Sequence, residues 1–146
     1  MKPLIFLIFT AFINPPSSTY GVTWLTDFEQ AKWKASQENK MILLNFSGSD
    51  WCAPCIRLKE KIFASEIFLQ HAEDNLVLAN ADFPRLKKNQ LGKKQILHNE
   101  DLAEKYNPDG KFPLTILLNA SGKLIKQWEG VPQKTAKQFV EDLKNF

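Results

Sequence analysis

The sequence Trp51-Cys52-Ala53-Pro54-Cys55 contains both cysteines of the chain and lies between two segments of different pattern. The preceding run, Met41-Ile42-Leu43-Leu44-Asn45-Phe46, is too continuously apolar for a strand with one face in water, so it predicts a central strand covered on both faces. The following run, residues 56–63, predicts a helix that ends near Ala64. Two cysteines three positions apart at the start of a helix lie one turn apart on the same side.

The position of Cys52 favours a negative charge on its sulfur. The first backbone N–H groups of a helix have no partners within the helix, and the helix dipole is positive at this end. The thiolate is the form of cysteine that attacks disulfides. Cys55 is close enough to resolve a mixed disulfide or to close an internal one, and we expect it to be the more buried of the two. The pair therefore predicts thiol–disulfide redox chemistry.

Two other roles for the cysteine pair are weaker. A structural disulfide between residues 52 and 55 would close almost no loop, so it would add little stability. A zinc site needs two more ligands, and the chain offers only His71 and His98, which have no metal-like spacing and are expected to be structural or solvated. We therefore expect no metal and no other cofactor.

Composition limits the classes of function. The chain has 146 residues, of which 44% are hydrophobic, and this is enough for one domain with a full core. The net charge is +3, but lysines alternate with acids along most of the chain, which argues against nucleic-acid binding. The exception is residues 85–94, which hold five cations and no acid; such a run is usually a solvated loop.

The first 20 residues have the pattern of a signal peptide. Lys2 precedes an apolar run over residues 4–13, which residues 14–18 then break. The run is too short to cross a bilayer as a helix, which takes about 20 apolar residues. We expect a signal peptide over 1–20, cleaved near Ser18 or Gly21, and an exported domain over 21–146 that is periplasmic or secreted. An uncleaved anchor and a buried N-terminal strand are the alternatives.

The rest of the chain predicts alternating helices and strands. Thr26 and Glu29 form a capping-box pattern that predicts a helix through about Glu38, with Trp24 and Leu25 on its apolar side. Further helices are expected over 65–71, over 99–106 with Asn99 as the cap, and around 136–143. Strands are expected over 76–82, 113–118 and 123–128, and a loop or irregular helix over 83–97. This order predicts an α/β fold with a mixed central β-sheet flanked by helices: parallel strands, then an antiparallel hairpin.

This order of elements around Trp-Cys-x-x-Cys resembles the thioredoxin superfamily from about Trp24 to Phe146. Within it, the chain is most similar to exported thioredoxin-like domains akin to the C-terminal domain of DsbD-type disulfide reductases. The residues that carry the resemblance are Leu43-Leu44-Asn45-Phe46, Trp51 to Cys55, Phe63-Ala64-Ser65-Glu66, Phe112-Pro113-Leu114-Thr115 and Asn119-Ala120-Ser121-Gly122-Lys123.

The resemblance implies roles for particular residues. Cys52 would be the nucleophile and Cys55 the resolving thiol. Trp51 would flank the site as an aromatic platform. Pro113 would be the family's cis-proline beside the disulfide and, with Phe112, would contact the substrate.

Two positions depart from the thioredoxin pattern. Thioredoxins carry a buried acid on the strand before the motif, and the matching residue here is Asn45, which cannot exchange a proton. The lysine that thioredoxins place on the next strand aligns with Leu78. The proton relay would therefore use water or a substitute such as Asp50 or Glu60, and we name Asn45 and Asp50 as candidate modulators of the dithiol.

The favoured function is that of an exported thiol–disulfide oxidoreductase, acting as a reductant or electron relay for protein disulfides. The chain has no second Cys-x-x-Cys motif to regenerate the site, so we expect an external redox partner, such as a membrane reductase. We expect a monomer. One alternative is a non-catalytic binding or chaperone module, which loss of the cysteines would favour. The other is a copper-handling dithiol protein, which Met-rich or His-rich segments would favour; the chain has two Met and two His.

Overall fold

The structure, a computed structural model, describes residues 20–146, so the expected signal peptide lies outside the described residues except for Tyr20. The elements in chain order are β1 (Trp24–Leu25), α1 (Phe28–Glu38), β2 (Met41–Ser47), α2 (Ala53–Leu58), the π-helical turn η1 (Lys59–Phe63), α3 (Glu66–Asn75), β3 (Leu76–Asp82), the 3₁₀ turn η2 (Lys87–Asn89), α4 (Lys93–Tyr106), β4 (Leu114–Leu118), β5 (Leu124–Glu129) and α5 (Ala136–Leu143). In this part of the chain no helix is both long and apolar enough to span a bilayer.

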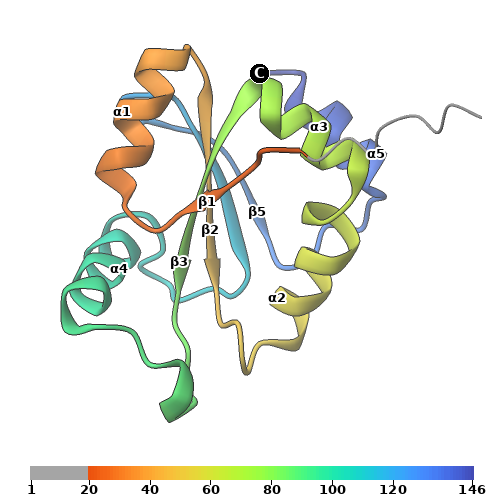
Figure 1. The fold of residues 1–146 in the computed structure, drawn as a ribbon. Coiled ribbons are helices and arrows are strands. Elements are labelled where there is room, and N and C mark those ends of the chain that lie inside the picture. The colour runs from red at the N-terminus through yellow and green to blue at the C-terminus, as the bar shows by residue number, and fades with distance from the viewer. Residues whose placement is uncertain (1–19) are drawn as a thin grey trace, which may run out of the picture.

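The described strands form one mixed sheet in the order β1-β3-β2-β4-β5 (Figure 1). β3 runs parallel to β1 and to β2, whereas β4 is antiparallel to both β2 and β5. β2 is thus the central strand, and its residues 42–47 are all buried, as its apolar sequence predicts. The expected α/β fold with a mixed central sheet is confirmed.

Alternation along the strands divides the core into two layers. Ile42, Leu44 and Phe46 of β2 face α1 and α4, whereas Leu43 faces the layer that contains α2, α3 and α5. Figure 1 shows the helices on the two faces of the sheet. The odd-numbered side chains of β2 therefore lie on the same face as the helix that carries the cysteines.

Two expected helix starts were wrong. Asp27, not Thr26, is the cap of α1: its carboxylate accepts the N–H of Gln30 at 3.0 Å, while Trp24 and Leu25 pair with β3 as a short strand. Asn99 lies in the middle of α4, which begins at Lys93 after Gly92. The Asn99 amide instead donates to the carbonyl of Asp82 at 2.8 Å, so this polar residue attaches α4 to the end of β3. Ser65 does cap α3, which continues to Asn75.

Candidate redox site

Cys52 and Cys55 form a disulfide at the start of α2, with their Cα atoms 5.2 Å apart. Cys52 is the N-cap residue, and its Sγ accepts the backbone N–H of Cys55 at 3.2 Å. The same N–H would stabilise a thiolate on Cys52 in the reduced protein. The two residues are equally buried, 4% and 5% exposed, so the expectation that Cys55 is the more buried was wrong. What distinguishes them is the cap position of Cys52.

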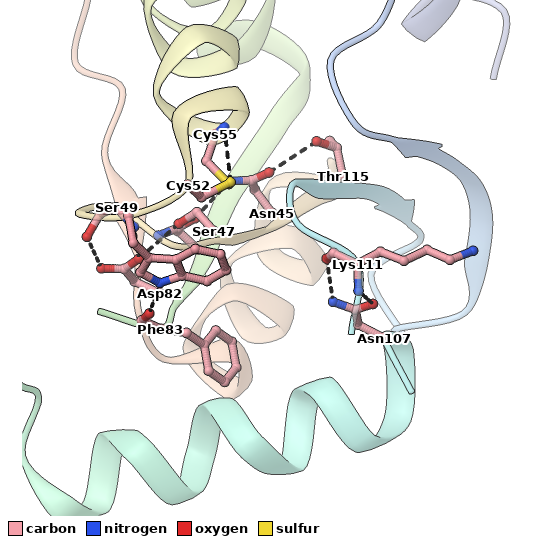
Figure 2. Close-up of a disulfide and its surroundings, with 12 residues drawn as sticks. Asn45, Ser47, Ser49, Cys52, Cys55, Asp82, Phe83, Asn107, Lys111 and Thr115 are labelled. Carbon is pink, nitrogen blue, oxygen red and sulfur yellow. Dashed lines mark hydrogen bonds between the residues drawn. A yellow bond between two sulfur atoms is a disulfide. The ribbon is translucent and has the colours of Figure 1, made fainter. Parts of the chain in front are cut away.

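A polar cluster lies on the sheet beneath the disulfide (Figure 2). Nδ2 of Asn45 donates to Oδ1 of Asn80 at 3.0 Å, and Oδ1 of Asn45 accepts the hydroxyl of Thr115 at 3.1 Å. The hydroxyl of Ser47 lies within 3.1 Å of Asn80 Oδ1 and 3.2 Å of Asp82 Oδ1. All five residues lie on the face of α2 because they alternate along β2, β3 and β4 and stand opposite one another across the sheet.

A cavity of about 470 Å³ connects this cluster with Cys55. Its lining includes Asn45, Ser47 and Asn80 from the sheet and Lys59 and Glu60 from η1. A cavity of this size, lined by polar side chains on its sheet side, has room for water. Of the three substitutes that the sequence suggests for a proton relay, Glu60 lines the same cavity as the resolving cysteine and water has room in it, whereas Asp50 is not among its lining residues. Leu78 is packed in the core beside Leu43 and has no part in the cavity.

Trp51 is held in place on several sides. Its indole N–H donates to the carbonyl of Phe83 at 2.7 Å, and its ring meets that of Phe112 edge to face, with the centroids 5.5 Å apart. The guanidinium of Arg85 stacks on the ring, 3.7 Å from its centroid. On its remaining side, a Cβ at Gly48 would collide with the indole ring, so only glycine fits beneath it. Trp51 is thus a fixed platform next to Cys52.

Phe112 and Pro113 precede β4, and the peptide bond between them is cis, as the resemblance implies. Phe112 is half-buried and links Trp51 to Phe83, with its ring centroid 5.4 Å from that of Phe83. Pro113 is buried, and its carbonyl accepts the N–H of Gly130. The sequence-based candidates Trp51 and Phe112 therefore touch each other; their contact with a substrate stays a prediction.

The carboxylate of Asp50 forms its hydrogen bonds with the loop after β3 and not with Cys52. Oδ1 accepts the backbone N–H of Arg85 at 2.9 Å, and Oδ2 accepts the N–H of Leu86 at 3.0 Å and the amide of Asn89 at 2.9 Å. These hydrogen bonds, that of Arg85 first, hold the pKa of the Asp50 carboxyl below its ordinary value. Asp50 therefore attaches the loop after β3 to the turn that carries the motif.

Both histidines have structural surroundings. Nε2 of His98 accepts the N–H of Phe28 at 3.1 Å, so the ring satisfies one of the unpaired N–H groups at the start of α1. His71 lies in α3, where the side chain of Asn75 donates to its carbonyl. Within residues 20–146, no group of three or more His, Cys, Asp or Glu side chains is arranged to hold a metal ion.

These features define a class of protein: the chain matches the family described as thioredoxin-like over residues 23–120, and it belongs to that family. Among curated proteins it is similar to the disulfide bond reductase DsbH of Chlamydia pneumoniae, with 32% identity over 110 residues that cover 75% of this chain and 64% of the relative. The chain thus spans less than two thirds of that relative's length.

Solved structures give the same result. A structure described as DsbH oxidoreductase has a TM-score of 0.79 and 28% identity to this chain, and the match covers 90% of this chain and 88% of the other. The oxidised C-terminal domain of Neisseria meningitidis DsbD, at 16% identity and a TM-score of 0.56, shares the fold over 84% of this chain and 98% of its own. The resemblance inferred from the sequence is confirmed.

Proposed function

We propose that the chain is a thiol–disulfide oxidoreductase that reduces disulfides in proteins, with Cys52 as the nucleophile and Cys55 as the resolving thiol. The observation that carries the proposal is the Cys52–Cys55 disulfide at the start of α2, where Sγ of Cys52 accepts a helix N–H. The name of its relative, a disulfide bond reductase, supports the direction of electron flow.

The proposed reaction has two exchange steps. The thiolate of Cys52 attacks one sulfur of the substrate, the substrate S–S bond breaks, and the leaving sulfur takes a proton. The thiolate of Cys55 then attacks Cys52, forms the intramolecular disulfide and releases the second substrate sulfur, which also takes a proton. The substrate gains two electrons and two protons, and the dithiol is oxidised to the disulfide because it loses the same two electrons and two protons. An external reductant must then return the electrons, since the chain has no other cysteines.

Export is part of the proposal. The apolar run over residues 4–13 supports a signal peptide over 1–20, and an oxidising compartment is where a disulfide reductase would find its substrates. The domain would then work in the periplasm or outside the cell as a monomer, and a membrane reductase could regenerate it.

The experiment that tests the direction is equilibration of the protein with a glutathione redox buffer, followed by quantification of the Cys52–Cys55 disulfide. A reduction potential near that of thioredoxin, about −270 mV, supports a reductant. A potential near that of DsbA, about −120 mV, would make the protein an oxidant and would overturn the proposed direction.

A further inference from the structure

The segment from Arg85 to Lys94, here called the basic segment, carries four lysines whose charge the fold does not use, besides Arg85, whose guanidinium stacks on Trp51. Its five cations are all exposed: Arg85, Lys87, Lys88, Lys93 and Lys94. None of them forms a salt bridge with any residue in the described range 20–146. The first turn of α4 contains two of the lysines and no acid, although a helix N-terminus favours acids. Fold stability therefore gives no reason for this concentration of positive charge.

The basic segment is attached directly to the redox site. The three hydrogen bonds from Arg85, Leu86 and Asn89 to Asp50 tie its first half to the turn before Cys52. Arg85 also stacks on Trp51, the residue adjacent to the nucleophile. The positive charge is thus held at a fixed place beside the dithiol, although some 35 residues separate Asp50 from Arg85 in sequence.

A pocket of about 430 Å³ lies between the basic segment and the redox site. Trp51, Phe83 and Phe112 supply aromatic walls on the side of the site. Arg85, Gln90 and Leu91 supply the wall on the side of the basic segment. Two acids that lie close to the basic segment already have partners: Asp82 accepts from Ser47 and Ser49, and Asp50 accepts from the backbone of Arg85 and Leu86. In α4, the acids that come before the last turn are Glu100 and Asp101, and both are exposed.

We propose that the basic segment and this pocket form a docking surface for an acidic polypeptide segment that flanks the disulfide of a protein partner. The proposal rests on the proposed function, because it concerns the partner whose disulfide Cys52 attacks. An acidic segment complements the five exposed cations, and an apolar side chain within it would fit the aromatic pocket. Such charge complementarity accelerates association, by about 10- to 1000-fold in low salt, and the acceleration falls as salt is added.

The test uses three peptides with the same disulfide and different flanks: four Glu, four Gln or four Lys residues. The second-order rate constant for reduction of each peptide is measured with the reduced protein in low salt and again at 0.5 M salt. The higher concentration screens the charges strongly, because it is roughly fifty times the ionic strength at which the Debye length is about 30 Å. The test variant replaces Lys87, Lys88, Lys93 and Lys94 by Gln. A control variant removes the same charge elsewhere by replacing with Gln four exposed lysines that form no salt bridge within residues 20–146: Lys61, Lys123, Lys126 and Lys137.

We expect the wild-type protein to reduce the Glu peptide about tenfold faster than the Gln peptide in low salt, and the Lys peptide more slowly than either. High salt and the test variant should both bring the Glu-to-Gln ratio close to one, whereas the control variant should keep most of it. A wild-type ratio of one, an unchanged ratio in the test variant, or an equal fall in both variants would overturn the docking surface. Failure to reduce even the Gln peptide would instead overturn the proposed function.

Discussion

Asn45 and Asn80 stand opposite each other on β2 and β3, and Nδ2 of Asn45 donates a hydrogen bond to Oδ1 of Asn80 at 3.0 Å. The pair lines the same cavity as Cys55. An amide at position 45 satisfies its neighbours but cannot take a proton from the resolving thiol. Asn45 is one of the two departures from the thioredoxin pattern that the sequence predicts.

Asn45→Asp should therefore accelerate resolution of the mixed disulfide near neutral pH, by about 10- to 100-fold, because a positioned base commonly contributes this much or more. Desolvation should favour the protonated form of the new carboxyl and bring its titration towards the working range. The oxidised protein should lose about 1–3 kcal/mol of unfolding free energy, since the substitution removes a donor from a buried site. Single-turnover resolution from pH 6 to 9 and a denaturant melt measure the two effects.

Asn45→Leu is the matched control for this prediction. It removes the same amide without adding an ionisable group, so it should lose stability and gain no rate. If Asn45→Asp resolves mixed disulfides no faster than the wild-type protein at any pH in this range, proton transfer through position 45 does not limit the reaction.

Gly48→Ala should displace Trp51. A Cβ at position 48 would lie closer than 3.0 Å to the indole ring, and the ring is held by Phe83 and Phe112. We expect a loss of about 1–3 kcal/mol, as is typical of overpacking, together with faster hydrogen exchange of the Trp51 indole N–H. Gly92→Ala is the control, because a Cβ there meets no atom within 4 Å. Equal exchange rates in the two variants would show that Trp51 is not confined as described.

Asp50→Asn should loosen the basic segment. The amide can accept at one atom only, so its NH₂ group would face the N–H of either Arg85 or Leu86 without a bond. We expect faster amide exchange at both residues and a lower preference for acidic peptides, with the disulfide still formed. Asp101→Asn, an exposed substitution in α4, is the control. Unchanged exchange at Arg85 and Leu86 would contradict the assigned anchoring role of Asp50.

His71 should make stability depend on pH. Burial, followed by the charge of Lys144, lowers the pKa of His71 below its ordinary value of 6.5. As the pH falls through 6.5, the unfolded chain takes up the proton before the folded chain does, so the unfolding free energy falls with pH in this window. One proton accounts for at most about 1.4 kcal/mol per pH unit. His71→Gln should reduce the slope between pH 7 and 5.5; an identical slope would contradict this assignment.

Local patterns in the sequence were enough to predict the sheet and the cysteine site. The run Met41 to Phe46 predicts a doubly covered strand because it is continuously apolar, and the strand is indeed buried along its length after Met41. Cys52 lies at a helix start, as the neighbouring sequence indicates. The start of α4 could not be predicted in this way. Gly92 provides no capping side chain, whereas Asn99 looks like a cap and is used for a contact with β3.

The rest of the site depends on contacts between distant segments. The family resemblance points to Asn45 but not to Asn80, Thr115 and Asp82, which join it through the register of three strands. Alternation along each strand, combined with the strand order, would have placed them on one face, but the order itself is not a local property. The bond from Asp50 to Arg85 likewise spans 35 residues, and no local pattern indicates it.

The most direct test of the central claim is to trap the mixed disulfide. Reduced Cys55→Ser and Cys52→Ser variants are mixed with a disulfide protein such as insulin, and the products are analysed by non-reducing mass spectrometry with peptide mapping. With Cys52 as the nucleophile, Cys55→Ser should accumulate a mixed disulfide through Cys52, because attack occurs without resolution. Cys52→Ser should form none and reduce no insulin. Full activity of Cys52→Ser, or a mixed disulfide through Cys55 in that variant, would contradict the account.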